Sequence, residues 1–228
     1  MGQVFGNDGT MRSEVDFYTR GSLPNVYAKK NSQVSFTWPV DEFDHATSLV
    51  QVARLDLQVV GELAAFRDPI PFGADGRKYN FYDPRAAGPI TDVPGYSHIM
   101  YEEVQPKVDM FFSSNSQGPV LYVQYRPGSH PESLYFQFTG QDSLRIDLEG
   151  NLKVFREAKY IELREAVAYQ VDGNGTVTDI LSWTADWDAI GESGIVKLLL
   201  EEYDPTKTLV LKVAYPAFPA MGGLAPID

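Results

Sequence analysis

The sequence predicts an all-β protein, built from antiparallel sandwich-like meanders with few or no helices. Three observations predict this class. Apolar and polar side chains alternate over short segments, as they do in half-buried strands. Turn residues, chiefly Gly, Pro, Asn and Asp, recur between these segments at intervals of roughly ten residues. The chain also has 13 Tyr and 13 Phe against 5 Met, and aromatic rings pack well on pleated sheets.

The first strands are expected between residues 15 and 38. Side chains alternate over residues 15–20, the pattern resumes at residues 26–30 after a Pro-Asn break, and residues 34–38 alternate again until Pro39. These segments predict a three-stranded meander. A further strand is expected over residues 50–60, with a helix that ends at the following glycine as the alternative.

The segment from residue 61 to residue 95 is expected to form long loops with at most one or two short strands. Proline and glycine interrupt it throughout, at Pro69, Pro71, Gly73, Gly76, Pro84, Gly88, Pro89 and Pro94. From residue 96 the strand pattern is continuous. It predicts strands at residues 108–112, 121–126, 134–139, 144–148, 152–155, 160–170, 177–183, 195–201 and 209–213. Hairpin turns are expected at residues 149–151 and 172–175, where Gly and Asn accept positive φ.

This punctuation divides the chain into three parts. Residues 1–80 form an N-terminal β subdomain, residues 81–214 form the main sandwich-like subdomain, and residues 215–228 form a Pro/Gly-rich tail or linker. One continuous sandwich is the alternative to two packed β subdomains.

Composition excludes several classes of function. The net charge of −12 and the absence of any long basic cluster argue against nucleic acid as a partner. No apolar run approaches the roughly 18 residues that a spanning helix needs, so membrane insertion is not expected. The chain has no cysteine, which removes disulfides and thiolate chemistry.

Several segments resemble, in order along the chain, the motifs of one known family. Residues 136–152 read FQFTGQDSLRIDLEGNL and are similar to the family's RFEGADSLRIDEDGNL. Residues 92–96 are similar to NVPAY, and residues 203–210 to YDPSKPLVID. The opening ENKGQW motif loses its Gln and Trp, which are Thr10 and Met11 here. The chain thus resembles the uncharacterised N-terminal β-rich domain of large secreted proteins of gliding bacteria.

That domain commonly precedes β-propeller-type SBBP repeats and a C-terminal sorting domain for type IX secretion. The resemblance implies an all-β fold and an extracellular or cell-surface location, with a signal peptide absent from this chain. It implies no catalytic residue, because the family has no established activity.

Motifs for catalysis are also missing from the residues themselves. The sequence has no Gly-x-Ser-x-Gly elbow and no His-Glu-x-x-His motif, and its three histidines offer little for a catalytic triad. We therefore expect no enzyme. A glycoside hydrolase with two carboxylates is the alternative, but among 31 acidic residues some pair will always lie at a suitable distance.

One cluster is a candidate ligand site. Trp183, Asp186, Trp187 and Asp188 fall close together in what we expect to be a loop between two strands, and Trp38 is a further candidate. Indole rings stack on sugars, and nearby carboxylates accept hydrogen bonds from hydroxyl groups. The opposing interpretation is that both loop tryptophans cap the edge of the sandwich while the acids solvate the loop.

The same cluster gives the candidate cation site. Asp186, Asp188 and Glu192 offer the oxygen ligands that Ca²⁺ prefers. Otherwise no cofactor is expected.

Together these features predict a non-catalytic structural or adhesive module that associates with other protein domains or with copies of itself. A carbohydrate-binding module, with a polysaccharide as partner, is the alternative.

Overall fold

The computed structural model describes residues 12–19, 24–40, 51–82, 88–115, 118–157, 159–164, 166–190 and 194–214. Within these ranges it contains strands and one short 3-10 helix, η1 (Pro131–Ser133), so the all-β prediction is confirmed. The strands are β1 (Val15–Tyr18), β2 (Asn25–Lys29), β3 (Gln33–Pro39), β4 (Val52–Val60), β5 (Ile70–Phe81), β6 (Ile90–Gln105), β7 (Val108–Asn115), β8 (Gly118–Tyr125), β9 (Tyr135–Thr139), β10 (Ser143–Ile146), β11 (Leu152–Arg156), β12 (Lys159–Leu163), β13 (Ala166–Val171), β14 (Val177–Ile190), β15 (Ile195–Leu199) and β16 (Thr208–Ala214).

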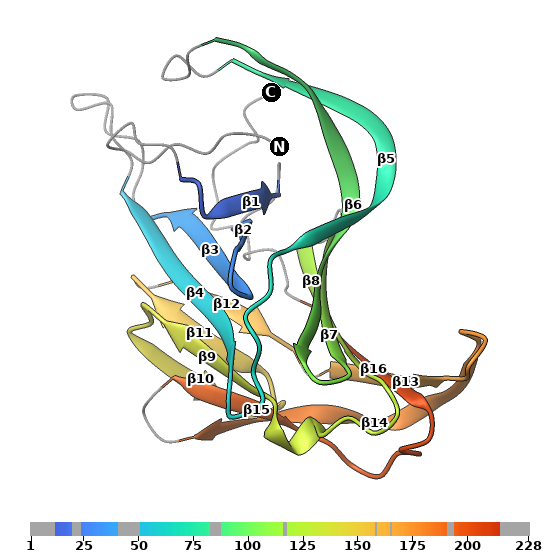
Figure 1. Cartoon of the computed structure of the whole chain (residues 1–228). Coiled ribbons are helices and arrows are strands. Elements are labelled where there is room, and N and C mark those ends of the chain that lie inside the picture. The colour runs from blue at the N-terminus through green and yellow to red at the C-terminus, as the bar shows by residue number, and fades with distance from the viewer. Residues whose placement is uncertain are drawn as a thin grey trace.

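Thirteen of the strands form one continuous antiparallel sheet, in the order β1-β2-β3-β4-β9-β15-β14-β13-β16-β8-β7-β6-β5. The long strand β14 joins its two halves. Residues 177–185 of β14 pair with β13, and residues 186–190 pair with β15. The sheet curls at β14, so that β1–β4 and β5–β8 stand on opposite sides of the molecule (Figure 1).

A second sheet, β10-β11-β12, has three strands. Leu152, Val154 and Leu163 are fully buried and belong to the same apolar core as the large sheet. The Lys159 ammonium donates to the carbonyl oxygen of Pro39 in β3 at 2.7 Å, which ties the two sheets together. The predicted strand at residues 160–170 is thus two strands: the chain leaves the small sheet at Leu163 and enters the large one as β13.

One core lies between the halves of the large sheet. Its members come from β2–β4 and β9 of one half, from β6–β8, β13 and β16 of the other, and also from β11, β12, β14 and β15. The Tyr101 hydroxyl of β6 reaches across to the carbonyl oxygens of Lys29, at 2.8 Å, and Gln33, at 2.9 Å, where β2 turns into β3. Because the core and this contact join both halves, the fold is a single curled, sandwich-like unit.

The predicted boundary between residues 80 and 81 does not separate two sheets. It falls inside β5, which pairs with β6 across it, and β4 pairs with β9 from the other side of it. The predicted tail at residues 215–228 lies outside the described residues.

The prediction of long loops between residues 61 and 95 is wrong for much of that segment. It contains β5 and the first part of β6, which form a long hairpin. β5 tolerates Pro71 because it is an edge strand, where a missing N–H costs no ladder bond. Its pairing with β6 also shifts register between Ala74 and Lys78, next to two glycines with positive φ, Gly73 and Gly76. Such a bulge absorbs residues that a regular strand excludes.

Both predicted hairpin turns are confirmed, and aspartate side chains fix them. In the turn between β10 and β11, the Asp147 carboxylate accepts backbone N–H groups from Glu149 at 3.1 Å and Asn151 at 2.9 Å. The Lys153 ammonium lies 2.8 Å from the same carboxylate. Chiefly through Lys153, these contacts hold the pKa of Asp147 at about 2.

Acid should therefore destabilise the fold. Hydrogen bonds also lower the pKa of Asp142, Asp179 and Asp204 below the ordinary value of 3.8. A carboxylate whose pKa is lower in the folded state contributes stability above the unfolded pKa, and this stability is lost as the pH falls through the folded one. We expect the melting temperature to drop between about pH 4 and pH 2. Circular dichroism melts measure it.

Asp147→Asn is the matched variant, because it removes the titrating group and should flatten part of that drop. Partial burial raises the pKa of Asp16, which acts in the opposite direction, but it is one group against five, since the pKa of Asp75 is lowered as well. A melting temperature that stays constant on acidification would contradict the prediction.

Candidate functional site

The predicted tryptophan and aspartate site is not a loop. Residues 183–188 lie within β14, so the expectation that they connect two strands is wrong. The side chains of Trp183 and Asp186, and residue Glu192, lie outside the described part of the structure.

Two of the candidate tryptophans belong to the core. Trp187 is 4% exposed and Trp38 is 1% exposed. The Trp187 ring contacts Phe136 edge to face at 5.9 Å between centroids, and its indole N–H donates to the carbonyl oxygen of Arg164 at 3.4 Å. A sugar ring cannot stack on buried indoles, so the role predicted for these two residues is wrong.

Of the three candidate cation ligands, only the side chain of Asp188 lies in the described part of the structure. The Asp188 carboxylate lies 3.7 Å from the ammonium of Lys197 on the neighbouring strand β15. Within the ranges that the structure describes, no three His, Asp or Glu side chains gather where they could hold a metal ion.

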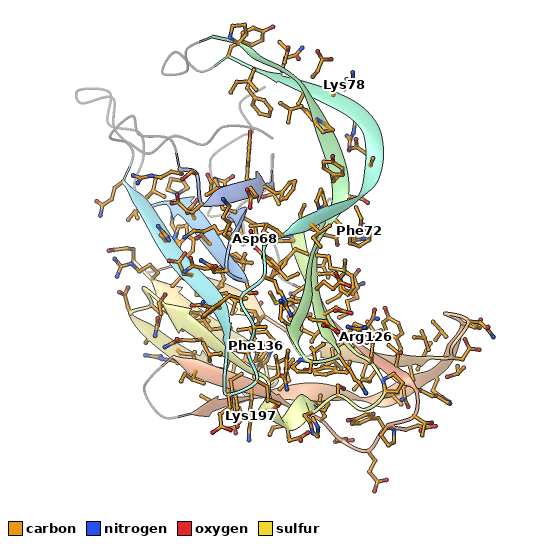
Figure 2. The ribbon with its side chains drawn as sticks, viewed as in Figure 1. Asp68, Phe72, Lys78, Arg126, Phe136 and Lys197 are labelled. Atoms are coloured by element: carbon orange, nitrogen blue, oxygen red, sulfur yellow. The ribbon has the colours of Figure 1, made fainter. Side chains whose placement is uncertain are left out.

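The structure instead forms a cleft of about 820 Å³ between β1–β2 and the β5–β6 hairpin. The two terminal strands of the large sheet, β1 and β5, both line it, because the curl of the sheet brings its ends together. In Figure 2, Asp68 lies on the cleft lining just before β5 begins, and Lys78 lies on the part of the hairpin that curves above it.

Aromatic rings from both walls meet across the cleft. Phe17 of β1 contacts Tyr96 of β6 edge to face at 6.1 Å, and Tyr18 of β1 contacts Phe81 of β5 at 6.0 Å between centroids. Tyr79 of β5 lies on the same lining. Tyr96 is 37% exposed and the other rings are half-buried, so ring surface is available to a ligand.

Charged side chains complete the lining. Asp75 accepts the backbone N–H of Arg77 at 2.8 Å and the Nε–H of its guanidinium at 2.7 Å, and these bonds hold the pKa of Asp75 below its ordinary value. Partial burial raises the pKa of Asp16. The Lys30 ammonium opposes that rise and the Asp68 carboxylate adds to it.

A second surface lies on the outer side of the large sheet, opposite the core. Register pairing places one row of side chains across six strands: Val167, Lys212, Tyr122, Phe111, Met100 and Ile70. A parallel row comprises Ile180, Tyr169, Val210, Gln124 and Asp109. We call these two rows the outer rows.

The outer rows are apolar and partly open to solvent. Ile180 is 77% exposed, Val167 50% and Ile70 44%. Of their two charged members, Asp109 is buried and lies 3.3 Å from the guanidinium of Arg126, which leaves Lys212 as the exposed charge.

Sequence reasoning missed both surfaces. The sequence does carry a signal for the outer rows, because strands such as 120–125 and 209–213 have apolar residues on both faces. The cleft combines a short N-terminal strand with a segment rich in proline, and no local pattern joins these two.

Comparison with known protein families finds one match. The family is described as a domain of unknown function, DUF7948, and the match covers residues 5–211. The chain belongs to the DUF7948 family. Since the match covers nearly the whole described fold, the curled sheet and its small companion sheet together are this family's domain in the present chain.

The other comparisons add no relative. No curated protein and no solved structure matches the chain. The comparisons thus identify no catalytic family for this DUF7948 domain. In the described residues no helix is long and apolar enough to cross a membrane.

Proposed function

We propose that this DUF7948 domain is a non-catalytic structural or adhesive module that associates with protein surfaces through the outer rows. The observation that carries the proposal is an apolar face on the solvent side of an antiparallel sheet. Such a sheet normally places its polar residues there. Contiguous exposed apolar side chains on a folded protein mark interaction sites.

The composition of the outer rows supports contact with another sheet. Phe111, Tyr122 and Tyr169 are large rings on a pleated surface, and rings dominate the energetics of interfaces. Near these rows, Phe72 stacks on His98 at 4.8 Å and contacts Phe111 at 5.8 Å, which holds that end of the face in one arrangement. A preorganised face loses less entropy when it docks.

The partner to test first is a second copy of the chain. The net charge of −12 opposes self-association in general, but the outer rows expose only one charged side chain, Lys212. An apolar face can pack on its own copy about a two-fold axis without needing complementary charges. Two sheets that pack face to face then bury both sets of rows.

Light scattering tests this association. Across a wide concentration range we expect the molar mass to rise towards twice the 25.4 kDa of one chain. Ile180→Lys and Val167→Lys place charges in the contact and should keep the protein monomeric. Both side chains are exposed, so the fold should tolerate the changes.

Leu148→Lys is the matched control. Leu148 is fully exposed on the turn of the small sheet, away from the outer rows, and its substitution should leave the mass unchanged. A monomeric wild-type chain at every concentration would contradict self-association. Dimers that persist in both lysine variants would place the contact elsewhere.

The proposed setting is a secreted or cell-surface protein of a gliding bacterium, in which this domain precedes SBBP repeats and a sorting domain. The support is the ordered set of motifs along the chain that resembles such proteins. In a multidomain surface protein, an apolar sheet face would let the module stack on copies of itself or on a neighbouring domain.

A further inference from the structure

We propose that the cleft between β1–β2 and the β5–β6 hairpin binds a neutral oligosaccharide. This goes beyond the association role and does not depend on it, because the cleft and the outer rows are different surfaces. Its volume of about 820 Å³ lies within the range of 300–1,000 Å³ that is typical of ligand sites.

The walls favour recognition by side chains over the addition of a peptide strand. A peptide would need a continuous row of free N–H and C=O groups along an edge. The edge strand β5 is interrupted by Pro71 and by the bulge between Ala74 and Lys78. β1 has four residues and its own register shift, between Val15 and Phe17. Sugars bind through hydroxyl groups and ring faces, which need no such row.

Aromatic and planar polar groups lie together in the cleft. Tyr79 and Tyr96 offer a flat apolar ring beside a phenol hydroxyl, the combination that suits the apolar face and hydroxyl rim of a sugar. The guanidinium of Arg77 lies 5.9 Å from the centre of the Tyr79 ring and is held by Asp75 at 2.6 Å. The pair therefore presents donors and acceptors in a fixed orientation before a ligand arrives.

The balance of charge selects neutral ligands. Three carboxylates line the cleft, Asp16, Asp68 and Asp75, against the two cations Lys30 and Arg77. Arg77 is paired with Asp75 at 2.6 Å. The lining therefore carries more negative than positive charge, and the net charge of −12 also repels an anionic glycan.

Calorimetric titration of the full chain tests the proposal. The probes are cellohexaose, maltohexaose, xylohexaose, mannohexaose and chitohexaose, with alginate and polygalacturonate as anionic counterparts. We expect saturable binding to at least one neutral probe and none to the anionic ones. Tyr96→Ala and Arg77→Ala should each weaken that binding by about tenfold, the change that corresponds to a loss of about 1.4 kcal/mol.

Tyr160→Ala is the matched control, because Tyr160 lies on β12 in the small sheet and contacts Phe155 instead of the cleft. Its affinity should equal that of the wild type. Arg77 is largely exposed, so its variant keeps the test valid if Tyr96→Ala fails to fold. Failure to bind any neutral probe, equal binding to the anionic ones, or unchanged affinity in Arg77→Ala would each overturn the proposal.

Discussion

Trp187→Ala should lower the free energy of unfolding by about 3–5 kcal/mol, the usual cost of removing a buried aromatic side chain. The indole is 4% exposed and lies against Phe136, so its loss leaves a cavity in the core that joins β9, β14 and β15. The carbonyl oxygen of Arg164 also loses its indole donor, which adds to the cost. Urea unfolding followed by circular dichroism measures the change.

Leu199→Ala is the control for this substitution. Leu199 lies on the neighbouring strand β15 and is 46% exposed, so its loss should change stability by no more than about 0.5 kcal/mol. Trp187→Phe should fall between the two, because it keeps a ring against Phe136. A Trp187→Ala protein as stable as the wild type would show that this indole is not a core residue and would revive it as a ligand group.

The alternation in the sequence was sufficient to find most strands. Strands 34–38, 108–112 and 209–213 were predicted within a few residues because their apolar side chains alternate towards one core. The same signal was present at residues 183–189, where Trp183, Ala185 and Trp187 alternate with polar residues. The sequence nevertheless predicts a loop here because the cluster falls between two expected strands, at a place where the resembled family has a short turn. In the structure, Asp188 lies directly across from Lys197 on the neighbouring strand β15, and the two side chains form an ion pair.

The hairpin β5–β6 could not be predicted from local sequence patterns. Pro71 and Pro94 signal loops, and only the position of β5 at the end of a long sheet makes proline acceptable there. Strand order is decided by packing between distant segments, such as β4 with β9 and β16 with β8. The cleft follows from that order, since it needs both ends of the sheet to meet, and sequence periodicity carries no information about where they meet.

Tyr101→Phe should cost about 1–3 kcal/mol of stability, although it removes a single oxygen atom. The Tyr101 hydroxyl shares its proton between the carbonyl oxygens of Lys29 and Gln33, on the far side of the core. Burial raises the pKa of Tyr101, so the hydroxyl stays protonated and remains a donor at every working pH. With Phe in its place, two largely enclosed carbonyl groups lose their donor.

Tyr101→Ala should be more damaging, by about 3–5 kcal/mol, because it also empties the core beside Phe112. The difference between the two variants separates the hydrogen bonds from the packing. Urea unfolding gives both costs.

Native-state hydrogen exchange then shows where the Tyr101→Phe cost falls. The amides of β2, β3 and β6 should exchange faster, because this hydroxyl holds the β5–β6 side of the sheet against the turn from β2 to β3. Exchange in β10–β12 should change least, since those strands form a separate sheet. If protection fell equally in every strand, or if Tyr101→Phe matched the wild type in stability, Tyr101 would not be the link that sets the two walls of the cleft against each other. If the expected pattern is found, Tyr101→Phe should also lower the affinity of the cleft for its ligand, although Tyr101 does not contact that ligand. The reason is that the cleft depends on the hairpin staying in place over β1.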